Sequence, residues 1–379
     1  MKITGIICEY NPLHLGHKKQ LDHVRAADPE GGIVCLMSGN YVQRGAPAVI
    51  DKMHRAKAAV LCGADLVLEL PVTAALSSAE GFAAKGVEIL SSFCDALCFG
   101  AESADGKLLM DTARVLLSPA FSEALKAELD KGLSFPAARQ SALEVLGVDG
   151  TLLSKPNNIL AVEYCKAILS QGSTMKPQVI LRQGGYHDTV PDKENPSATA
   201  LRAMMEQEQD WKRYVPAAAD YGDTTIHSLN YGEKAILAKL RTMSDDEFEA
   251  LPYGSEGLWR KLMHAARAES TLDAILDATK SKRYTRTRLD RMVLCAFLGI
   301  TEQTLHAPAP YVRVLAFSDK GREILKTARI SGEFPNIGQR MDHPYQLLED
   351  RCGALYGLFA DKPESPDAES QYRVFYHKA

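Results

Sequence analysis

The stretch IICEYNPLHLGH, residues 6 to 17, decides the fold. Its apolar run breaks at an Asn-Pro pair, and two histidines follow, His14 and His17, with Gly16 between them. The pattern predicts the end of a buried strand followed directly by the start of a helix. Because three residues make almost one helical turn, both imidazoles are expected on the first turn and on nearly the same face.

A helix that begins here suits a polyphosphate ligand. Its first turn offers unpaired N–H groups and the positive end of the helix dipole. Gly16 leaves room beside the backbone, and His14 and His17 would donate hydrogen bonds to phosphoryl oxygens as charge builds up in a transition state. The residues leave two alternatives open: two surface histidines at a helix cap, or a zinc site, which needs more ligands than this pair supplies.

The bulk composition indicates a folded protein with two domains. The 379 residues exceed the size at which a single core usually stops growing. Apolar residues make up 46% and charged residues 24%, as in ordinary globular proteins. A net charge of -4 gives no general attraction to nucleic acid or anionic membrane, so a polyanion must be held by a local patch.

The cysteines and the N-terminal residues favour a cytoplasmic protein. The apolar run near the N-terminus is too short for a secretory signal, and no stretch reaches about 18 uninterrupted apolar residues. We therefore expect no membrane partner. The cysteines are scattered, contain no CxxC pair and are expected to be buried, reduced thiols: Cys8, Cys35, Cys62, Cys94, Cys98, Cys165, Cys295 and Cys352.

Up to about residue 100, short apolar runs alternate with helical patterns. The runs predict strands at 3–10, 31–38, 64–71 and 94–101, separated by helices at 14–27, 51–62 and 77–92. Their continuous hydrophobicity predicts a parallel sheet that is covered on both faces, with ligands bound outside the carboxyl ends of the strands. The expected fold class is α/β with a Rossmann-like parallel sheet.

Helical patterns dominate the rest of the chain. A helix at 116–132 is expected to end at Gly132, and another to carry Pro156 in its first turn. A fifth strand is predicted at 176–183, before a helix with Ser197 as its N-cap. Because strand signals fade after residue 210, we predict a catalytic domain at residues 1–210 and a mainly α-helical domain at residues 211–379.

The histidine motif resembles the HxGH signature of the nucleotidyltransferase superfamily, shared with class I aminoacyl-tRNA synthetases, whose members activate an acceptor at the α-phosphate of ATP. SATALR resembles that superfamily's second phosphate-binding motif, with Ser197, Thr199 and Arg202 placed to hold the β- and γ-phosphates. Ala198 departs from the serine usual there. The simpler alternative makes Ser197 only an N-cap and Arg202 a solvated side chain.

Six segments in order narrow the resemblance. EYNPLHLGH, MSGNYVQRG, DLVLELP, FGAES, SKPNNIL and KRYTRTRLDRM resemble the bacterial tRNA(Met) cytidine acetate ligase family, from residue 1 to about residue 290. The resemblance implies a cytoplasmic ligase that makes acetyl-adenylate from ATP and acetate. It then acetylates N4 of the wobble cytidine in elongator tRNA(Met). Mg2+ is expected with the triphosphate.

The resemblance also implies which residues contact ATP, with His14 and His17 as the catalytic pair and no resident metal. The residues themselves leave two alternatives at three of these positions. Gly100 either lets adenine or ribose approach the backbone or is an ordinary strand-end glycine, Asn157 either reads a base or ribose edge or caps a helix, and Arg182 either meets a ligand or is solvated. The implied ATP contacts are Ile7, Cys8, Glu9, Tyr10, Asn11, Pro12, His14, Gly16, His17, Gly100, Asn157, Arg182, Ser197, Thr199 and Arg202.

The loop GNYVQRG, residues 39 to 45, lies at the same predicted sheet edge. Its Tyr41 and Arg44 could close over the substrate or stack on a splayed base, or the loop could be plain surface. The helix that follows begins with polar side chains that we expect to be solvated: Asp51, Lys52, His54 and Arg55.

A basic cluster near residue 286 is the predicted RNA contact. It combines cations with a stacking ring, as proteins that bind single-stranded RNA do, although a solvated basic helix face is the simpler alternative. Its members are Lys282, Arg283, Tyr284, Arg286, Arg288 and Arg291.

Two other functions stay open at this point. The protein could transfer AMP to a small phosphorylated substrate, although about 170 residues beyond the predicted catalytic domain favour a macromolecular acceptor. It could also be a non-catalytic RNA-binding protein with a degenerate nucleotide fold.

Overall fold

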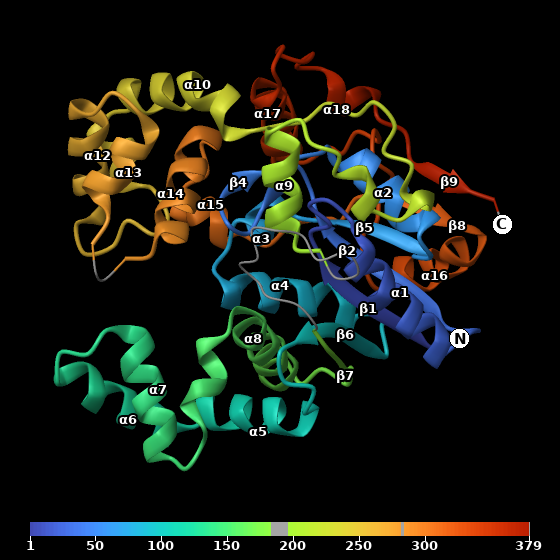
Figure 1. Ribbon diagram of the computed structural model, residues 1–379, viewed down its shortest axis with the longest axis horizontal. Helices are drawn as coiled ribbons and strands as arrows, with labels where there is room; N and C mark the ends of the chain where they lie inside the picture. Colours follow the sequence, from blue (N-terminus) through green and yellow to red (C-terminus); the bar gives the residue numbers. More distant parts are fainter. Residues whose placement is uncertain (183–195, 282–283, 379) are drawn as a thin grey trace.

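The computed structural model describes residues 1–182, 196–281 and 284–378, and in them a seven-stranded sheet forms the centre of the molecule (Figure 1). The strand order is β7-β6-β1-β2-β5-β8-β9, and all neighbouring pairs are parallel except β5 and β8. The bounds are β1 Ile3–Cys8, β2 Gly32–Ser38, β5 Leu66–Leu70, β6 Ala96–Ala101, β7 Lys176–Leu181, β8 Val314–Ser318 and β9 Phe375–His377. The five strands predicted from the sequence and their parallel pairing are confirmed.

The central strands are buried on both faces because their side chains alternate between two cores. In β2, Val34 and Leu36 face one core, whereas Ile33 and Cys35 face the other. Seven of the eight cysteines are buried, Cys8 is half-buried, and all eight are free, so the expectation of reduced thiols is confirmed.

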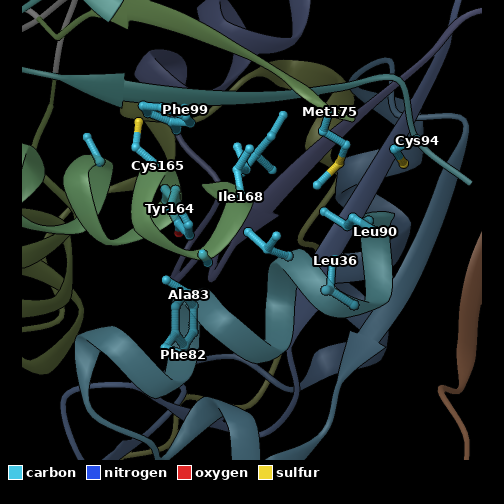
Figure 2. Close-up of a cluster of buried hydrophobic side chains, with 14 of the residues drawn as sticks. Leu36, Phe82, Ala83, Leu90, Cys94, Phe99, Tyr164, Cys165, Ile168 and Met175 are labelled. Carbon is cyan, nitrogen blue, oxygen red and sulfur yellow. The ribbon is translucent and has the colours of Figure 1, made fainter. Parts of the chain in front are cut away.

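Helices cover each face of this sheet, as the crossover pattern predicts. One face packs against α4, α5, α8 and α16, and the other against α1, α2 and α9 (Figure 1). Figure 2 shows the core on the first of these faces, where the Phe99 and Tyr164 ring centroids are 5.3 Å apart. The bounds are α1 Leu15–Ala27, α2 Lys52–Leu61, α3 Val72–Ala75, α4 Ala79–Ser91, α5 Gly106–Leu116, α6 Pro119–Asp130, α7 Phe135–Val145, α8 Pro156–Ser170, α9 Ala198–Glu206 and α16 Asp319–Ser331.

A third core lies in the helices that follow residue 228, as expected from the fading of strand signals. Its main helices lie side by side at one end of the molecule (Figure 1). The bounds are α10 Leu229–Thr242, α11 Asp245–Glu249, α12 Leu258–Ala268, α13 Leu272–Thr279, α14 Arg286–Leu298, α15 Glu302–His306, α17 Pro344–Tyr356 and α18 Ala368–Gln371. None of the helices in the described ranges has the length and apolarity that a membrane span requires.

Several local features differ from the sequence predictions. The helix expected at 116–132 begins three residues later, at Pro119 of α6, because Ser118 caps α6 and the preceding α5 ends at Leu116. Its predicted end is confirmed, since Gly132 has a φ of 84°. The strands β8 and β9 were not predicted, and they join the sheet formed by the N-terminal residues. The division at residue 210 stays a prediction.

A buried ion cluster joins the C-terminal residues to the sheet. Arg313 contacts Glu69 at 2.9 Å, Glu349 at 3.2 Å and Glu369 at 2.7 Å. Lys52 pairs with Glu69 at 3.0 Å and also contacts Glu369. We call these five side chains the ion cluster. Four of them, all except Glu369, line a cavity of only about 20 Å³.

The prediction that Lys52 and Arg55 are solvated is wrong, since both are buried. Asp51 caps α2 by accepting hydrogen bonds from Met53 and His54, so the helix begins against the sheet rather than in solvent. Lys52 then meets carboxylates that are distant in sequence, and Arg55 meets backbone carbonyls. His54 is exposed on the same turn, as expected.

Candidate active site

A cavity of about 540 Å³ lies at the carboxyl ends of β1, β6 and β7. We call it the catalytic cavity. It brings together every predicted ATP-contacting residue except Pro12, which is buried in the turn before α1. Its described lining is Ile7, Cys8, Glu9, Tyr10, Asn11, His14, Gly16, His17, Lys19, Gln20, His23, Val42, Gln43, Arg44, Ala46, Pro47, Phe82, Phe99, Gly100, Asn157, Leu160, Tyr164, Ile180, Leu181, Arg182, Pro196, Ser197, Ala198, Thr199 and Arg202.

The two histidines cap α1 reciprocally. His14 is the N-cap residue, and its Nδ1 accepts a hydrogen bond from the Gly16 amide at 3.1 Å. The His14 amide donates in turn to Nδ1 of His17 at 3.3 Å. The rings stack with centroids 3.7 Å apart and an interplanar angle of 25°. Imidazoles here replace the hydroxyl and carboxylate of an ordinary capping box.

This cap fixes the tautomer of both rings. Because each Nδ1 accepts a backbone N–H, each neutral ring carries its proton on Nε2. Burial, with the Arg182 and Arg202 guanidinium groups, lowers the pKa of His14 to about 3. Burial, His14 and Arg182 lower the pKa of His17 well below its usual value. Both rings are therefore neutral hydrogen-bond donors near neutral pH.

His14 Nε2 is buried, and no described residue accepts its hydrogen bond. A buried donor that lacks an acceptor costs about 1–3 kcal/mol, so an acceptor oxygen supplied by a ligand would bind favourably here. The donor lies at the N-terminus of α1, where the free amides and the helix dipole also favour an anion. The arrangement suits a phosphoryl oxygen.

The start of α9 lies in the same lining. Ser197 Oγ accepts from the Ala200 amide at 3.0 Å, so its predicted role as N-cap is confirmed. Arg202 donates to Thr199 Oγ1 at 3.1 Å and to the Asn11 carbonyl at 2.8 Å. Arg202 thereby links this helix to the turn before α1, so two helix N-termini and a guanidinium group share one cavity.

A third part of the lining is held by a carboxylate. Arg182 donates to Asn157 Oδ1 at 3.0 Å, and Asn157 Nδ2 donates to Glu102 Oε1 at 2.7 Å. The other Glu102 oxygen accepts from the Asn158 amide at 2.8 Å, at the first turn of α8. Glu102 therefore positions both predicted ATP-contacting side chains, although it does not line the cavity.

Two glycines differ in what they allow. A Cβ on Gly16 would lie 3.0 Å from Cε1 of His14, so a side chain there would displace the His14 ring. A Cβ on Gly100 would meet described atoms no closer than 3.9 Å, so packing does not require glycine at that position. Gly100 instead leaves backbone exposed toward the cavity, which is the arrangement a closely approaching ligand needs.

The loop at residues 39–45 contains the short strands β3 (Tyr41–Val42) and β4 (Ala46–Pro47). Tyr41 is buried and donates to the Cys352 carbonyl at 2.8 Å, so it packs in the helical core and does not stack on a base. Arg44 lines the catalytic cavity. At Gly45 a Cβ would lie 2.4 Å from the Arg291 amide nitrogen, which means that the loop rests directly on α14.

Arg55 of α2 holds the carboxyl ends of β1 and β2 through hydrogen bonds to backbone carbonyls at these ends. It is fully buried and donates to the carbonyls of Glu9 at 2.6 Å and Ser38 at 3.0 Å. It also donates to the Ile50 carbonyl at 2.7 Å and to the Gly39 carbonyl. Its charge is therefore compensated by backbone dipoles, and it orders the turn that carries Glu9.

The predicted RNA-binding residues have several partners within the protein. Arg286 pairs with Asp273 at 2.7 Å and with Asp290 at 2.9 Å. Arg288 donates to the Tyr253 carbonyl at 2.8 Å and lies over the Tyr284 ring. Arg291 is buried beneath the loop, donating to the Gln43 carbonyl at 3.3 Å. Lys282 and Arg283 lie outside the described residues.

The sequence analysis missed part of the lining. Lys19, Gln20 and His23 continue the face of α1 that carries Gly16, and Leu160 and Tyr164 continue the face of α8 that carries Asn157. Helical spacing from the recognised residues would have found them. The role of Glu102 could not be predicted from the sequence in this way, because its contacts with the first turn of α8 form only in the folded protein.

The described residues contain no group of three or more histidine, cysteine, aspartate or glutamate side chains that could hold a metal ion. Within that part of the chain, Glu9 is the single carboxylate in the lining. The cavity therefore has the donors for a polyanion and few ligands for a resident metal.

Comparisons with known proteins agree with this geometry. The family model for HIGH Nucleotidyl Transferase matches residues 1–369. The tRNA(Met) cytidine acetate ligase of Clostridium acetobutylicum is 36% identical over 372 residues, covering 92% of each chain. That of Clostridium perfringens is 37% identical over 356 residues, covering 88% of each.

Solved structures give the same result. Thermotoga maritima TmcAL in its apo form superposes with a TM-score of 0.89 at 30% identity, covering 100% of both chains. The same protein bound with alpha-thio ATP gives a TM-score of 0.86. The chain described here therefore belongs to the tRNA(Met) cytidine acetate ligase family of HIGH nucleotidyl transferases.

Proposed function

We propose that the protein activates acetate with ATP and transfers the acetyl group to N4 of the wobble cytidine of elongator tRNA(Met). Membership of the family supports the overall reaction, and the catalytic cavity supports the nucleotide step. The tRNA and ATP substrates favour a cytoplasmic location.

One observation carries the proposal: the buried His14 Nε2 donor, for which no described residue is an acceptor. Acetate attacks the α-phosphorus of ATP, a P–O bond to pyrophosphate breaks, and negative charge increases on the transferring group. The Nε2–H groups of His14 and His17 donate to that charge. Because the cap holds both rings before substrate binds, little reorganisation is required.

The start of α9 is suited to the leaving pyrophosphate. Thr199 and Arg202 offer a hydroxyl and a guanidinium group beside the helix N-terminus capped by Ser197, a combination that binds phosphate oxygens well. Gly100, Asn157 and Arg182 also line the cavity, at β6, at the start of α8 and directly after β7, and the nucleoside would lie against them. Mg2+ would arrive with ATP and be held mainly by phosphate oxygens, as it commonly is in nucleotide sites.

For the tRNA, we propose contacts from the basic cluster of residues 282–291. Arg288 and Tyr284 combine a cation with an aromatic ring 4.8 Å away, an arrangement that can stack on a base. Arg291 is better suited to a structural role, because it is buried between α14 and the loop. Replacing Arg286 and Arg288 together with alanine should weaken tRNA binding and reduce its salt dependence. Unchanged affinity at all salt concentrations would remove the cluster from the RNA surface.

The test of the reaction uses the purified protein, Mg-ATP, labelled acetate and bulk bacterial tRNA, followed by nucleoside analysis. The proposal expects label in N4-acetylcytidine, with formation of AMP and pyrophosphate. His17→Ala should abolish it. Transfer of AMP to a small phosphorylated compound, or tRNA binding without turnover, would replace the proposal with one of the two alternative functions.

A further inference from the structure

Glu9 is unusual in the catalytic cavity because its charge opposes the substrates. It is the single carboxylate among the described lining residues, which also include Lys19, Arg44, Arg182 and Arg202. ATP and acetate are both anions, so a carboxylate in this lining disfavours the binding of each. Because the Glu9 carboxylate weakens the binding of both first-step substrates, we expect its role in the second step, where the nucleophile is the cytidine amine.

The protein holds the Glu9 carboxylate in place. Oε1 accepts from the Gln43 amide at 2.7 Å, and the Glu9 carbonyl accepts from Arg55 at 2.6 Å. None of the described residues donates a hydrogen bond to Oε2. The carboxylate also lies near the cavity wall formed by Tyr164, whose pKa is raised by burial and further by the charge of Glu9. One oxygen is thus anchored, and the side chain is oriented before substrate binds.

Other lining groups are poorly suited to accept a proton. The two catalytic histidines carry their protons on Nε2, because each Nδ1 already accepts a backbone N–H. Burial raises the pKa of the Cys8 thiol and of the Tyr10 hydroxyl, so both stay protonated and act as donors. His23 is exposed on α1, six residues beyond His17, or about 9 Å along the helix.

We propose that the Glu9 carboxylate accepts the proton that the cytidine N4 amine loses when it attacks acetyl-adenylate. This role rests on the proposed function. The N4 lone pair forms a C–N bond to the acetyl carbon, the bond from that carbon to the AMP oxygen breaks, and AMP leaves with the electron pair. One N4 proton passes to Glu9, which later releases it to water. Before the attack, the same carboxylate accepts a hydrogen bond from the amine and orients it.

The test separates the two steps with Glu9→Gln, which keeps the side-chain size and an acceptor for the Gln43 amide. The first step is followed by acetate-dependent exchange of pyrophosphate into ATP, and the second by acetylation of tRNA from supplied acetyl-adenylate. Glu9→Gln should lower the second rate at least about 100-fold, the range for loss of a general base. In the exchange assay it should lower the acetate KM, because a negative charge is removed.

Three further variants complete the test. His14→Asn keeps a side-chain acceptor for the helix cap. Supplied acetyl-adenylate should restore tRNA acetylation in this variant but not in Glu9→Gln. Glu9→Asp retains a carboxylate and should recover part of the transfer rate. Glu30→Gln, at an exposed position remote from the cavity, should match the wild type in both assays.

Several outcomes would overturn the assignment. Equal losses in both steps, or a first-step loss that excess Mg2+ restores, would make Glu9 a nucleotide-binding residue. A transfer rate that stays high in Glu9→Gln but falls in His23→Gln would move the proton acceptor to His23. If the wild type exchanges pyrophosphate but never acetylates tRNA, or does neither, the proposed function fails and the role of Glu9 fails with it.

Discussion

The catalytic cavity and the ion cluster use charged residues in opposite ways. In the ion cluster, Lys52 and Arg313 are surrounded by three glutamates and enclose a cavity of about 20 Å³. The catalytic cavity is about 540 Å³, and its described lining contains several cations and one carboxylate. Every charged side chain of the ion cluster pairs with an opposite charge inside the protein, whereas the catalytic cavity keeps a buried His14 donor for which no described residue is an acceptor.

The difference shows how to separate structural from functional charges. Residue type does not distinguish them, since Arg313 and Arg202 are both arginines near the sheet. What distinguishes them is their surroundings. Arg313 is paired with buried carboxylates in the ion cluster, whereas Arg202 lies with helix N-termini in the lining of the catalytic cavity. The two regions should therefore respond to substitution in different measurements.

The largest expected effect is on stability, in the ion cluster. Arg313→Met removes the central cation and leaves three buried glutamates with Lys52 alone, which should lower the free energy of unfolding by about 3–5 kcal/mol. Urea unfolding followed by circular dichroism measures this. Arg322→Met, at an exposed arginine of α16, is the control and should cost less than about 1 kcal/mol. If the two variants are equally stable, the ion cluster does not hold the C-terminal residues to the sheet.

The next largest effect is expected on the rate of the first step, with little loss of stability. His14→Asn preserves a cap for α1 but removes the Nε2 donor, so acetate-dependent pyrophosphate exchange should fall about 100- to 1,000-fold. The free energy of unfolding should fall by no more than about 1 kcal/mol, because the variant keeps the cap and the lost donor has no acceptor among the described residues. Exchange at the wild-type rate would show that the His14 ring does not act on the nucleotide.

A smaller effect concerns the pH dependence of stability. Burial and the charge of Glu69 raise the pKa of Glu349 to about 7, against a model-compound value of 4.5, although Arg313 opposes the shift. Between these values the unfolded chain is ionised while the folded protein keeps the proton. Unfolding therefore releases a proton, and this contribution to stability declines as the pH rises from 4.5 to 7.

Glu349→Gln should lack that decline, so the variant should gain stability relative to the wild type between pH 5 and pH 8, by up to about 3 kcal/mol. Unfolding curves collected across this range measure the gain. The control is Glu323→Gln, at an exposed carboxylate on α16, which should give a difference independent of pH. Parallel curves for Glu349→Gln and the wild type would contradict the raised pKa.

The smallest effect returns to the catalytic cavity. Glu102→Gln weakens the contacts that position Asn157 and Arg182, so the KM for ATP should rise about tenfold while kcat changes little. Asp105→Asn, which alters the carboxylate cap of neighbouring α5, is the matched control and should leave both constants unchanged. A fall in kcat with an unchanged KM would place Glu102 in the chemical step rather than in nucleotide positioning.

Much of the catalytic cavity could be predicted from the sequence because its elements are local. The strand before His14, the cap and the helix start occupy twelve consecutive residues, and their order alone specifies the turn. Ser197 is an N-cap for the same reason. The carboxyl ends of parallel strands meet at one sheet edge, so residues far apart in sequence could be expected together there.

The buried charges could not be predicted in this way. Polar residues at a helix start are solvated in most proteins, and nothing near Lys52 or Arg55 in the sequence indicates otherwise. The carboxylate of Glu369 lies 317 residues from Lys52 along the chain, and Arg55 is satisfied by carbonyls whose position depends on the sheet. The burial of Tyr41 and Arg291 could not be predicted either, because it depends on contacts of the loop with α17 and α14.

Local sequence patterns were enough to predict the five parallel strands, the Ser197 cap and the motif that names the superfamily, because hydrophobic periodicity and capping act between residues close along the chain. The packed fold sets which charges are enclosed, which face the catalytic cavity, and that Glu9 lies in the cavity lining together with several cations. Solvation and counter-charge are properties of the space around a side chain, and distant segments create that space when they pack.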